Sequence, residues 1–333
     1  MNYIGSKFSL MPFLESTINA IVGSDLQNKV FCDIFAGTGI VGRTFKQRVR
    51  KVISNDWEYY SYVLNRNYIG NHIKLDEGDK LLSELNSIEG IEDGFIYKNY
   101  CYGSGSGRQY FSDENGKKID AIRKKIEEWK NCGEISEDLY FFLLASLLES
   151  ADKLANTASV YGAFLKHLKS SAQKTFNLEP AVYSINSNTN EVYCSDANEL
   201  IKNIEGDILY LDPPYNSRQY GANYHLLNTI AEYKPFTPKG KTGLREYHRS
   251  NYCGKKTVLL SFDDLLKNAQ FKFIVLSYNN EGLMSLDDIK STMSKYGRYE
   301  IFSQEYHRFQ ADKESNRHHA AIKTTEYLHV LEK

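Results

Sequence analysis

Five short runs of apolar, largely β-branched residues constrain the fold more than any other feature of the chain. They end in polar turns and occupy residues 29–34, 50–54, 191–195, 207–211 and 271–277. Runs of this length are typical of strands buried on both faces of a parallel sheet. Apolar residues at helical spacing flank the first two runs, in residues 8–22 and 57–68. Because strands that alternate with helices build doubly wound sheets, the sequence predicts an α/β fold.

The end of the chain has a different pattern. Residues 298–308 and 324–331 alternate apolar with polar side chains, and the gap between them is short and polar. Such alternation is typical of antiparallel strands with one solvated face. We therefore expect an antiparallel pair that closes one edge of the sheet.

The strand and helix alternation breaks between residues 72 and 180, which is too long for a connection in a compact α/β unit. Ile119, Ile122, Ile126 and Trp129 would share one helix face, and Ser136 is placed to cap a long apolar helix. We expect a domain made of residues 1–71 and 181–333, with a mainly helical insert at 72–180.

Composition excludes several classes of protein. The 333 residues are 41% hydrophobic and 25% charged with a net charge of -1, which excludes disordered, collagen-like and disulfide-scaffold chains. No apolar run has membrane-spanning length and no signal-peptide layout begins the chain, so we expect a cytoplasmic protein without a membrane partner. The five cysteines are far apart and form no C-x-x-C pair, and we expect no metal site.

Basic residues concentrate in one stretch. Residues 218–256 contain eight basic and two acidic side chains, a net charge of +6, on a chain whose total is -1. Such a segment can bind a polyanion such as nucleic acid. A solvated loop gives the same pattern, so the charge alone leaves both interpretations open.

A glycine-rich turn follows the first predicted strand. Gly37, Gly39 and Gly42 satisfy the G-x-G-x-x-G pattern, which lets backbone approach a nucleotide or nucleoside closely. Asp56 ends the next strand and would accept hydrogen bonds from ribose hydroxyls, while Trp57 offers a face for an adenine ring. The turn therefore favours a nucleoside cofactor, although a tight turn without a ligand would look similar.

Asp33 separates two candidate cofactors, NAD and S-adenosylmethionine. It lies at the mouth of the glycine-rich turn. A carboxylate there would repel a pyrophosphate, but it would pair with the ammonium group of a methionine moiety. We therefore expect S-adenosylmethionine.

The strongest signal is the tetrapeptide Asp212, Pro213, Pro214 and Tyr215, which follows a buried strand. Two prolines after an acid are costly in regular structure and indicate a rigid corner. An exocyclic base amine is a poor nucleophile, and the Asp212 carboxylate and the Pro213 carbonyl could accept its N–H groups and aim its lone pair at a methyl donor. Tyr215 would stack on the base once it is flipped out.

Together these motifs resemble those of the N6-adenine DNA methyltransferases of the alpha, Dam-like group. The resemblance also covers residues 3–7, reading YIGSK, and residues 194–197, reading CSDA. It implies a Rossmann-like S-adenosylmethionine-dependent sheet with an antiparallel C-terminal hairpin, and a target-recognition role for the insert. It also implies a cofactor site made of Tyr3, Lys7, Asp33, Phe35, Gly37, Gly39, Asp56, Trp57 and Asp196.

The expected activity is methylation of adenine N6 in double-stranded DNA. The basic stretch is similar to that of type II restriction-system methylases, which makes a cognate restriction endonuclease a further expected partner. Catalysis would use Asp212 to Tyr215. The side chains expected to contact DNA are Arg108, Gln109, Arg218, Tyr220, Lys241, Arg245 and Arg308.

Three alternatives remain open from the sequence. The same tetrapeptide serves methylation of RNA adenine or of the N4 amine of DNA cytosine. An NAD-dependent oxidoreductase fits the glycine pattern alone but leaves residues 212–215 unexplained. A non-catalytic DNA-binding protein that keeps a methylase fold is the third.

Overall fold

The computed structural model describes residues 7–165, 167–307 and 323–333, which form two compact units. The sheet unit contains residues 7–57, Asn186–Gln219 and the described part of Arg249–Lys333. The helical unit contains the described parts of Glu58–Ile185 and Tyr220–His248. The expected division at residues 72 and 180 stays a prediction.

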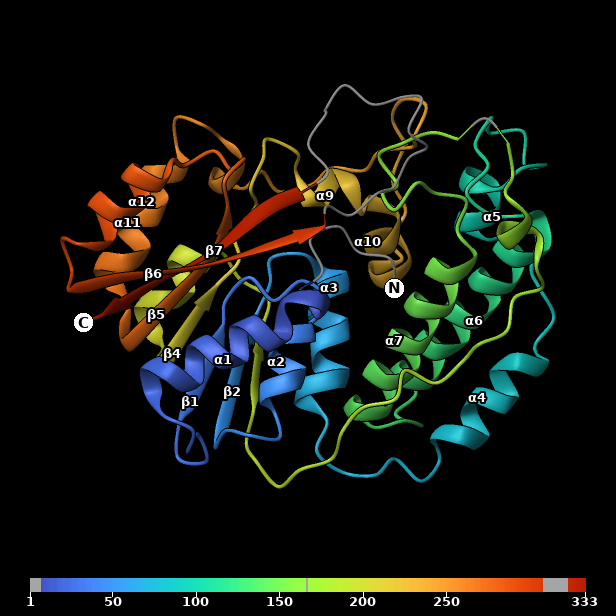
Figure 1. Cartoon of the computed structure of the whole chain (residues 1–333). Coiled ribbons are helices and arrows are strands. Elements are labelled where there is room, and N and C mark those ends of the chain that lie inside the picture. Colours follow the sequence, from blue (N-terminus) through green and yellow to red (C-terminus); the bar gives the residue numbers. More distant parts are fainter. Residues whose placement is uncertain (1–6, 166, 308–322) are drawn as a thin grey trace. The chain divides into compact units, whose positions relative to one another are not determined.

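The sheet unit is built on a mixed sheet with the strand order β3-β2-β1-β4-β5-β7-β6 (Figure 1). The first five strands are parallel, whereas β7 runs antiparallel to both β5 and β6. The α/β fold, its five parallel strands and the antiparallel pair at the edge are therefore confirmed. The strands are β1 Val30–Asp33, β2 Lys51–Asn55, β3 Glu191–Tyr193, β4 Glu205–Leu211, β5 Gln270–Asn279, β6 Arg298–His307 and β7 Lys323–Glu332.

Helices cover both faces of this sheet. Cys32 and Ile274 point to one face, where they pack in one buried cluster with Phe262 of α11. Phe31 points to the other face and stacks on Phe45 of α2 with 4.3 Å between ring centroids. The unit is thus a three-layer sandwich. Its helical segments are η1 Phe8–Leu10, α1 Met11–Val22, α2 Ile40–Phe45, α8 Ala197–Leu200, η4 Ile201–Asn203, η5 Asn251–Cys253, α11 Val258–Asn268 and α12 Leu286–Met293.

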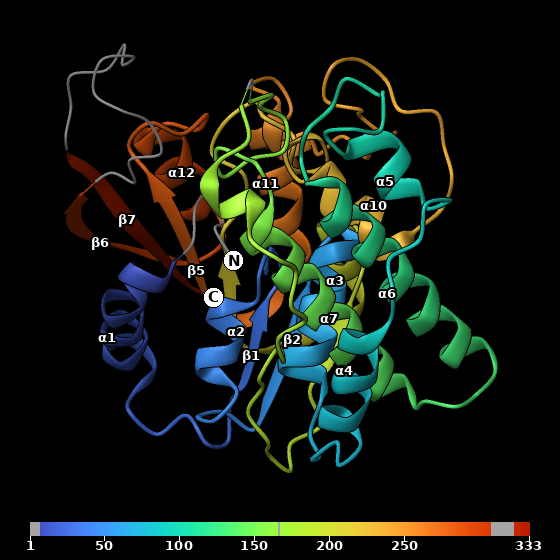
Figure 2. The ribbon, with the colours of Figure 1, turned by 90° about the vertical axis from the view of Figure 1, so that its right-hand side faces the viewer.

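The helical unit has the amphipathic pattern that the sequence predicts. Ile119, Ile122, Ile126 and Trp129 are all buried on α6, and α6 lies beside α7 (Figure 2). Ser136 caps α7 by accepting a hydrogen bond from the backbone of its first turn. The segments are α3 Tyr59–Asn65, the π-helical η2 Arg66–Gly70, α4 Gly78–Ser87, α5 Phe95–Tyr100, α6 Asp113–Asn131, α7 Glu137–Leu154, η3 Ser170–Gln173, α9 Tyr220–Asn223 and α10 His225–Glu232.

A buried arginine joins the stretch after the tetrapeptide to the insert. Arg123 of α6 is 2% exposed, and its guanidinium donates to the carbonyls of Ile230 and Ala231 at 3.0 and 2.9 Å. Both carbonyls belong to the last turn of α10. Carbonyls in the last turn of a helix have no backbone N–H partner within the helix, and the helix dipole gives this end a partial negative charge that attracts a cation. Residues 220–248 therefore fold as part of the helical unit, far along the chain from the insert.

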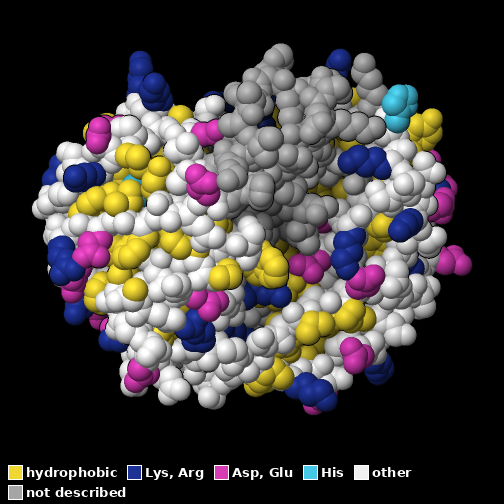
Figure 3. Space-filling view, viewed as in Figure 1, with side chains coloured by type: hydrophobic (Ala, Val, Ile, Leu, Met, Phe, Trp, Pro, Cys, Tyr) yellow, Lys and Arg dark blue, Asp and Glu magenta, His cyan; other side chains and the backbone are white. Residues whose placement is uncertain are grey.

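Charged side chains do not segregate by sign on the face drawn in Figure 3, where basic and acidic groups alternate. This agrees with the net charge of -1. Among the described residues no helix combines the length and the apolar character needed to cross a bilayer. None of the five cysteines forms a disulfide; Cys32, Cys101 and Cys253 are buried, and Cys132 and Cys194 are exposed.

Replacing Arg123 by methionine should destabilise the protein by about 3 kcal/mol, because two helix-end carbonyls lose a buried charged donor. Urea denaturation would measure the change, and limited proteolysis should show earlier cleavage within residues 233–248. The control is Lys124→Met, whose ammonium lies at the surface beside Asp93. Equal midpoints for the two variants would show that Arg123 does not anchor α10.

Candidate active site

The site is assembled where the parallel strands end. Cys32 of β1 pairs with Ile53 of β2 and with Leu209 of β4, so these strands finish nearly level with one another. The carboxyl ends of parallel strands form the ligand edge of open α/β sheets. Consequently Asp33, Asp56 and Asp212, which end or follow the three strands, stand at the same edge.

The glycine-rich turn needs the left-handed backbone that glycine provides. Gly37 has φ 52° and Gly39 has φ 76°, and α2 begins directly after Gly39. The backbone N–H of Gly37 donates to Oδ2 of Asp56 at 2.8 Å. This bond fixes the carboxylate of Asp56 against the turn, as expected for two parts of one cofactor pocket.

Asp33 is the most buried acid beside the turn, at 1% exposure. Burial raises the pKa of this carboxyl well above its ordinary value, and the charges of Asp212 and Asp56 raise it further. Its Oδ1 is buried and finds no hydrogen-bond partner within the described residues. A buried acceptor without a donor is costly, and a cationic ligand would satisfy it.

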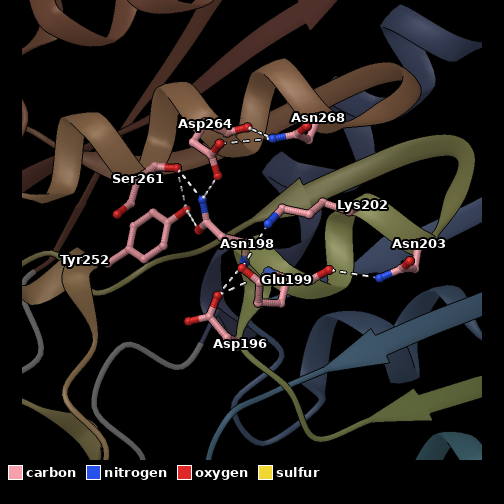
Figure 4. A network of polar contacts seen from close by, with 9 residues as sticks. All are labelled: Asp196, Asn198, Glu199, Lys202, Asn203, Tyr252, Ser261, Asp264 and Asn268. Atoms are coloured by element: carbon pink, nitrogen blue, oxygen red, sulfur yellow. Dashed lines mark hydrogen bonds and ion pairs between the residues drawn. The ribbon is translucent and has the colours of Figure 1, made fainter.

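Asp196 has a structural role that the sequence did not reveal. It is the N-cap of α8, and its Oδ1 accepts from the backbone N–H groups of Asn198 and Glu199 at 2.8 and 3.3 Å. Its second oxygen points away from this network (Figure 4). One oxygen therefore orients the carboxylate, and the other lies outside the capping bonds.

The helix that carries Asp196 is fixed to α11 by one amide side chain. Asn198 donates to the carbonyl of Ser261 at 2.8 Å and to the Asp264 carboxylate at 2.7 Å, and it accepts from the Tyr252 hydroxyl at 2.9 Å (Figure 4). The ring of Tyr252 in turn packs edge-on against Phe35, with centroids 4.9 Å apart. Tyr252 and Asn198 thus link the glycine-rich turn to Asp196 and hold two predicted cofactor positions.

The corner after β4 is partly open. Pro213 is buried, and the Asp212 side chain is 19% exposed, so the corner is rigid while its carboxylate remains accessible. Burial raises the pKa of Asp212 to about 6, against the lowering effect of Lys7. An acid with a pKa near 6 is ionised at neutral pH and can accept a hydrogen bond there.

Lys7 lies inside the site rather than at its surface. Its ammonium is 3.1 Å from Oδ1 of Asp212 and 3.1 Å from Oε1 of Glu326, and it donates to the Tyr215 hydroxyl at 2.5 Å. Burial lowers the pKa of Lys7, but the charges of Asp212 and Glu326 outweigh this effect and keep the group protonated. The structure shows Lys7 in contact with the corner and Glu326, and its expected contact with the cofactor stays a prediction.

Glu326 and Ser277 belong to this cluster, and sequence reasoning did not identify either. Glu326 lies near the start of β7, opposite Asn279 at the end of β5. Its carboxylate accepts from the hydroxyls of Tyr215 and Ser277, each at 2.6 Å. An acid in an otherwise alternating strand was the available signal, but only the antiparallel register with β5 places it at the site.

The residues expected to contact DNA divide between the two units. Arg218 is exposed in the sheet unit, and Lys241 is exposed in the helical unit. Tyr220 stacks on Tyr224 at 5.9 Å. Tyr3 and Arg308 lie outside the described residues.

Other expected contacts are engaged within the helical unit. Arg108 donates to the carbonyls of Asn99 and Gly240, and Gln109 donates to that of Leu165. Arg245 pairs with Glu232 at 2.8 Å. These side chains hold loops in place, so any contact with DNA would add to a structural role.

A shallow pocket of about 420 Å³ opens in the basic stretch of the helical unit. Its lining residues are Lys234, Pro235, Phe236, Thr237, Lys239, Arg245 and Glu246. Lys234 makes no ion pair among the described residues, whereas Lys239 pairs with Glu246. The pocket therefore offers basic groups to an anion such as phosphate.

The residues at the sheet edge fit S-adenosylmethionine. The unpartnered Oδ1 of Asp33 suits an ammonium group, whose positive charge would favour the ionised carboxylate, and an ionised Asp33 would oppose a pyrophosphate. Asp56, Asp196 and the left-handed turn provide acceptors and close backbone approach for a nucleoside. Within the described residues, His, Cys, Asp and Glu side chains form no group that could hold a metal ion.

Comparison with known proteins agrees with this chemistry. Residues 3–321 match the family model for D12 class N6 adenine-specific DNA methyltransferases. The chain is 62% identical to the type II methyltransferase M.NlaIII of Neisseria lactamica, covering 100% of this chain and 99% of that protein. It is 40% identical to M.CviAII of Paramecium bursaria Chlorella virus 1, over 93% of each chain. It is 38% identical to M.FokI of Planomicrobium okeanokoites, over 100% of this chain and 53% of the relative.

Asp33→Asn should weaken the binding of S-adenosylmethionine at least tenfold, because the substitution keeps the shape and removes the charge that would pair with an ammonium. Calorimetric titration of the purified protein measures the dissociation constant. Glu205→Gln, at the exposed start of β4 and the opposite edge of the sheet, is the control and should bind as the parent does. An unchanged constant for Asp33→Asn would remove Asp33 from the cofactor site.

Proposed function

The chain belongs to the D12 class of N6 adenine-specific DNA methyltransferases, and from this membership we propose which of its groups hold cofactor, base and DNA. The reaction moves a methyl group from S-adenosylmethionine to the N6 amine of adenine in DNA. The observation that carries the assignment is the partly open corner at residues 212–215, beside the turn that carries Asp33.

The cofactor assignment follows the sheet edge. When bound, S-adenosylmethionine supplies an electrophilic methyl group on a positively charged sulfur. Asp33 would hold the ammonium of its methionine moiety, and Asp56 would accept from the ribose hydroxyls. Asp196 would accept from the adenine amine through the oxygen that does not cap α8. Phe35 and Trp57 would pack against the cofactor's rings, a role taken from the resemblance.

The target adenine would sit at the corner. The Asp212 carboxylate and the Pro213 carbonyl would accept its two amine N–H bonds and direct the nitrogen lone pair at the methyl group. Lys7 stays protonated beside Asp212 and fixes that carboxylate in place. Because a base inside a duplex cannot reach such a corner, the adenine must be rotated out of the helix. Tyr215 would pack against the flipped base.

The helical unit is proposed to grip the DNA. Arg123 joins residues 220–248 to the insert, so the recognition surface would include both the insert and the basic stretch. The pocket lined by Lys234 and Lys239 would receive a backbone phosphate. Double-stranded DNA is the proposed form of the substrate.

The biological setting follows from the relatives. M.NlaIII and M.CviAII carry type II methyltransferase names, and we place this chain in the same role, as the modification enzyme of a restriction system. A cognate restriction endonuclease is the proposed partner in that system. The cytoplasmic location expected from the sequence remains a prediction.

Family membership removes the NAD-dependent oxidoreductase from the alternatives, because the whole set of motifs belongs to a methyltransferase. The RNA and cytosine alternatives share the corner and differ in the polymer or base that reaches it. They are tested by identifying the methylated nucleoside.

Incubation with S-adenosylmethionine should produce N6-methyladenine in unmethylated DNA and none in RNA, as measured by mass spectrometry of the nucleosides. Asp212→Ala should lower the yield at least a thousandfold while cofactor affinity stays within twofold, because the variant loses an acceptor used only at the base amine. Asp287→Ala, exposed on α12, is the matched control. Methylation of RNA or of cytosine would correct the substrate, and an active Asp212→Ala protein would reject the corner.

Replacing Lys234 and Lys241 together by glutamine should weaken DNA binding and reduce the slope of log affinity against log salt by about two, one unit for each lost phosphate contact. Fluorescence anisotropy with labelled duplex at several salt concentrations gives the slope. Lys290→Gln, exposed on α12 of the sheet unit, is the control. A slope equal to that of the parent would show that the basic stretch does not hold phosphate.

A further inference from the structure

Glu326 is a buried acid that neither the sequence pattern nor the resemblance assigns to the site. Its exposure is 0%, and its Oε1 accepts from Lys7, Tyr215 and Ser277. Burying a carboxylate is costly unless partners satisfy it, and an apolar residue would serve a strand equally well. The strand therefore bears an electrostatic cost at this position. Lys7, Tyr215 and Ser277 offset it at Oε1 only, because Oε2 has no hydrogen-bond partner among the described residues.

The charges around Lys7 do not balance. One ammonium lies 3.1 Å from Oδ1 of Asp212 and 3.1 Å from Oε1 of Glu326, which leaves the three groups with a net charge of -1 when both acids are ionised. In a simple pair the ammonium would neutralise Asp212 alone. Because Glu326 shares it, Asp212 keeps more of its negative charge and more of its capacity to accept a hydrogen bond.

Glu326 also sets the hydrogen-bond direction at Tyr215. Lys7 can only donate, so the Tyr215 hydroxyl accepts from it at 2.5 Å and gives its own proton to Glu326 at 2.6 Å. The Tyr215 ring is further held by Tyr278, with centroids 4.8 Å apart. Glu326 thus holds both Lys7 and the Tyr215 hydroxyl, the two groups next to Asp212.

We propose that Glu326 is a positioning residue for methyl transfer, which divides the charge of Lys7 and anchors Tyr215 so that Asp212 presents an incompletely neutralised carboxylate to the adenine amine. This inference rests on the function proposed above. Glu326 acts through Lys7 and Tyr215, and the acceptor of the amine remains Asp212.

A shift in the pH profile separates this role from a purely structural one. The charged or titratable groups that face Asp212 are Lys7, Glu326, Tyr215, Asp33 and Tyr210. Burial raises the pKa of Asp212 to about 6, Lys7 opposes this, and Glu326 adds to it. The ionised acceptor is therefore present above about pH 6 and is lost below it. Removing the charge of Glu326 lowers the pKa and moves the acid limb to lower pH.

The experiment compares Glu326→Gln with the parent, using unmethylated plasmid and genomic DNA. We expect kcat at neutral pH to fall at least tenfold and the acid limb of kcat to move to lower pH. The dissociation constant of S-adenosylmethionine, measured by calorimetry, should stay within twofold. Glu326→Asp keeps the charge and should retain the parental acid limb with partly recovered kcat. Glu332→Gln, the same change at the far end of β7, should match the parent in every measurement.

Each other outcome has a defined meaning. A Glu326→Gln protein with the parental kcat and acid limb overturns the inference. So does a variant that melts at lower temperature and loses activity with an unshifted acid limb, since that is the behaviour of a structural residue. A parental protein that forms no N6-methyladenine rejects the proposed function and this inference with it. If the parental protein forms N6-methyladenine and Glu326→Gln behaves as the parent does, the inference is rejected but the proposed function stands.

Discussion

The level ends of β1, β2 and β4 are the constraint on which the candidate site depends. The parallel register brings Asp33, Asp56 and Asp212 to one edge of the sheet, where like charges oppose one another. Burial raises the pKa of Asp33, and its two neighbours raise it further, so the edge is short of positive charge. Lys7 supplies one cation from within the chain. A ligand with an ammonium and a sulfonium adds positive charge at this edge, which gives a physical reason why the edge suits S-adenosylmethionine better than a pyrophosphate cofactor.

The antiparallel strand β7, which lies between β5 and β6, adds a feature that a wholly parallel sheet could not. A parallel strand would bring its carboxyl end to the site, whereas β7 brings its beginning there, because Glu326 pairs with Asn279 at the end of β5. The acid therefore contacts both Lys7 and the Tyr215 hydroxyl of the corner. Lys7 is fixed in position between Asp212 and Glu326 and does not fully neutralise either acid. Asp212 therefore keeps the capacity to accept a hydrogen bond that the proposed chemistry requires.

The sequence predicted what depends on local patterns. The parallel strands, the antiparallel pair, the buried face of α6 and the Ser136 cap all follow from spacing within a few residues. It missed what depends on register or on distant pairing. Glu326 reaches the site only through the pairing of β5 with β7, and the capping role of Asp196 was hidden behind its expected contact with the cofactor. Likewise, no local signal shows that α10 folds with the insert. This association depends on hydrogen bonds from Arg123 to the carbonyls of Ile230 and Ala231, which lie more than a hundred residues along the chain.

The basic stretch shows why net charge overstates the capacity to bind DNA. Residues 218–256 carry a net charge of +6, yet Arg245 is paired with Glu232, and Lys239 faces Glu246. A cation already paired with an acid gains less from a phosphate, because it must exchange one partner for the other. Within the described residues Lys234 and Lys241 are among the basic groups of this stretch for which no ion pair with an acid is seen, and a contact of such groups with phosphate would release counterions in full. The salt dependence of binding should therefore follow the unpaired lysines rather than the total charge of the segment.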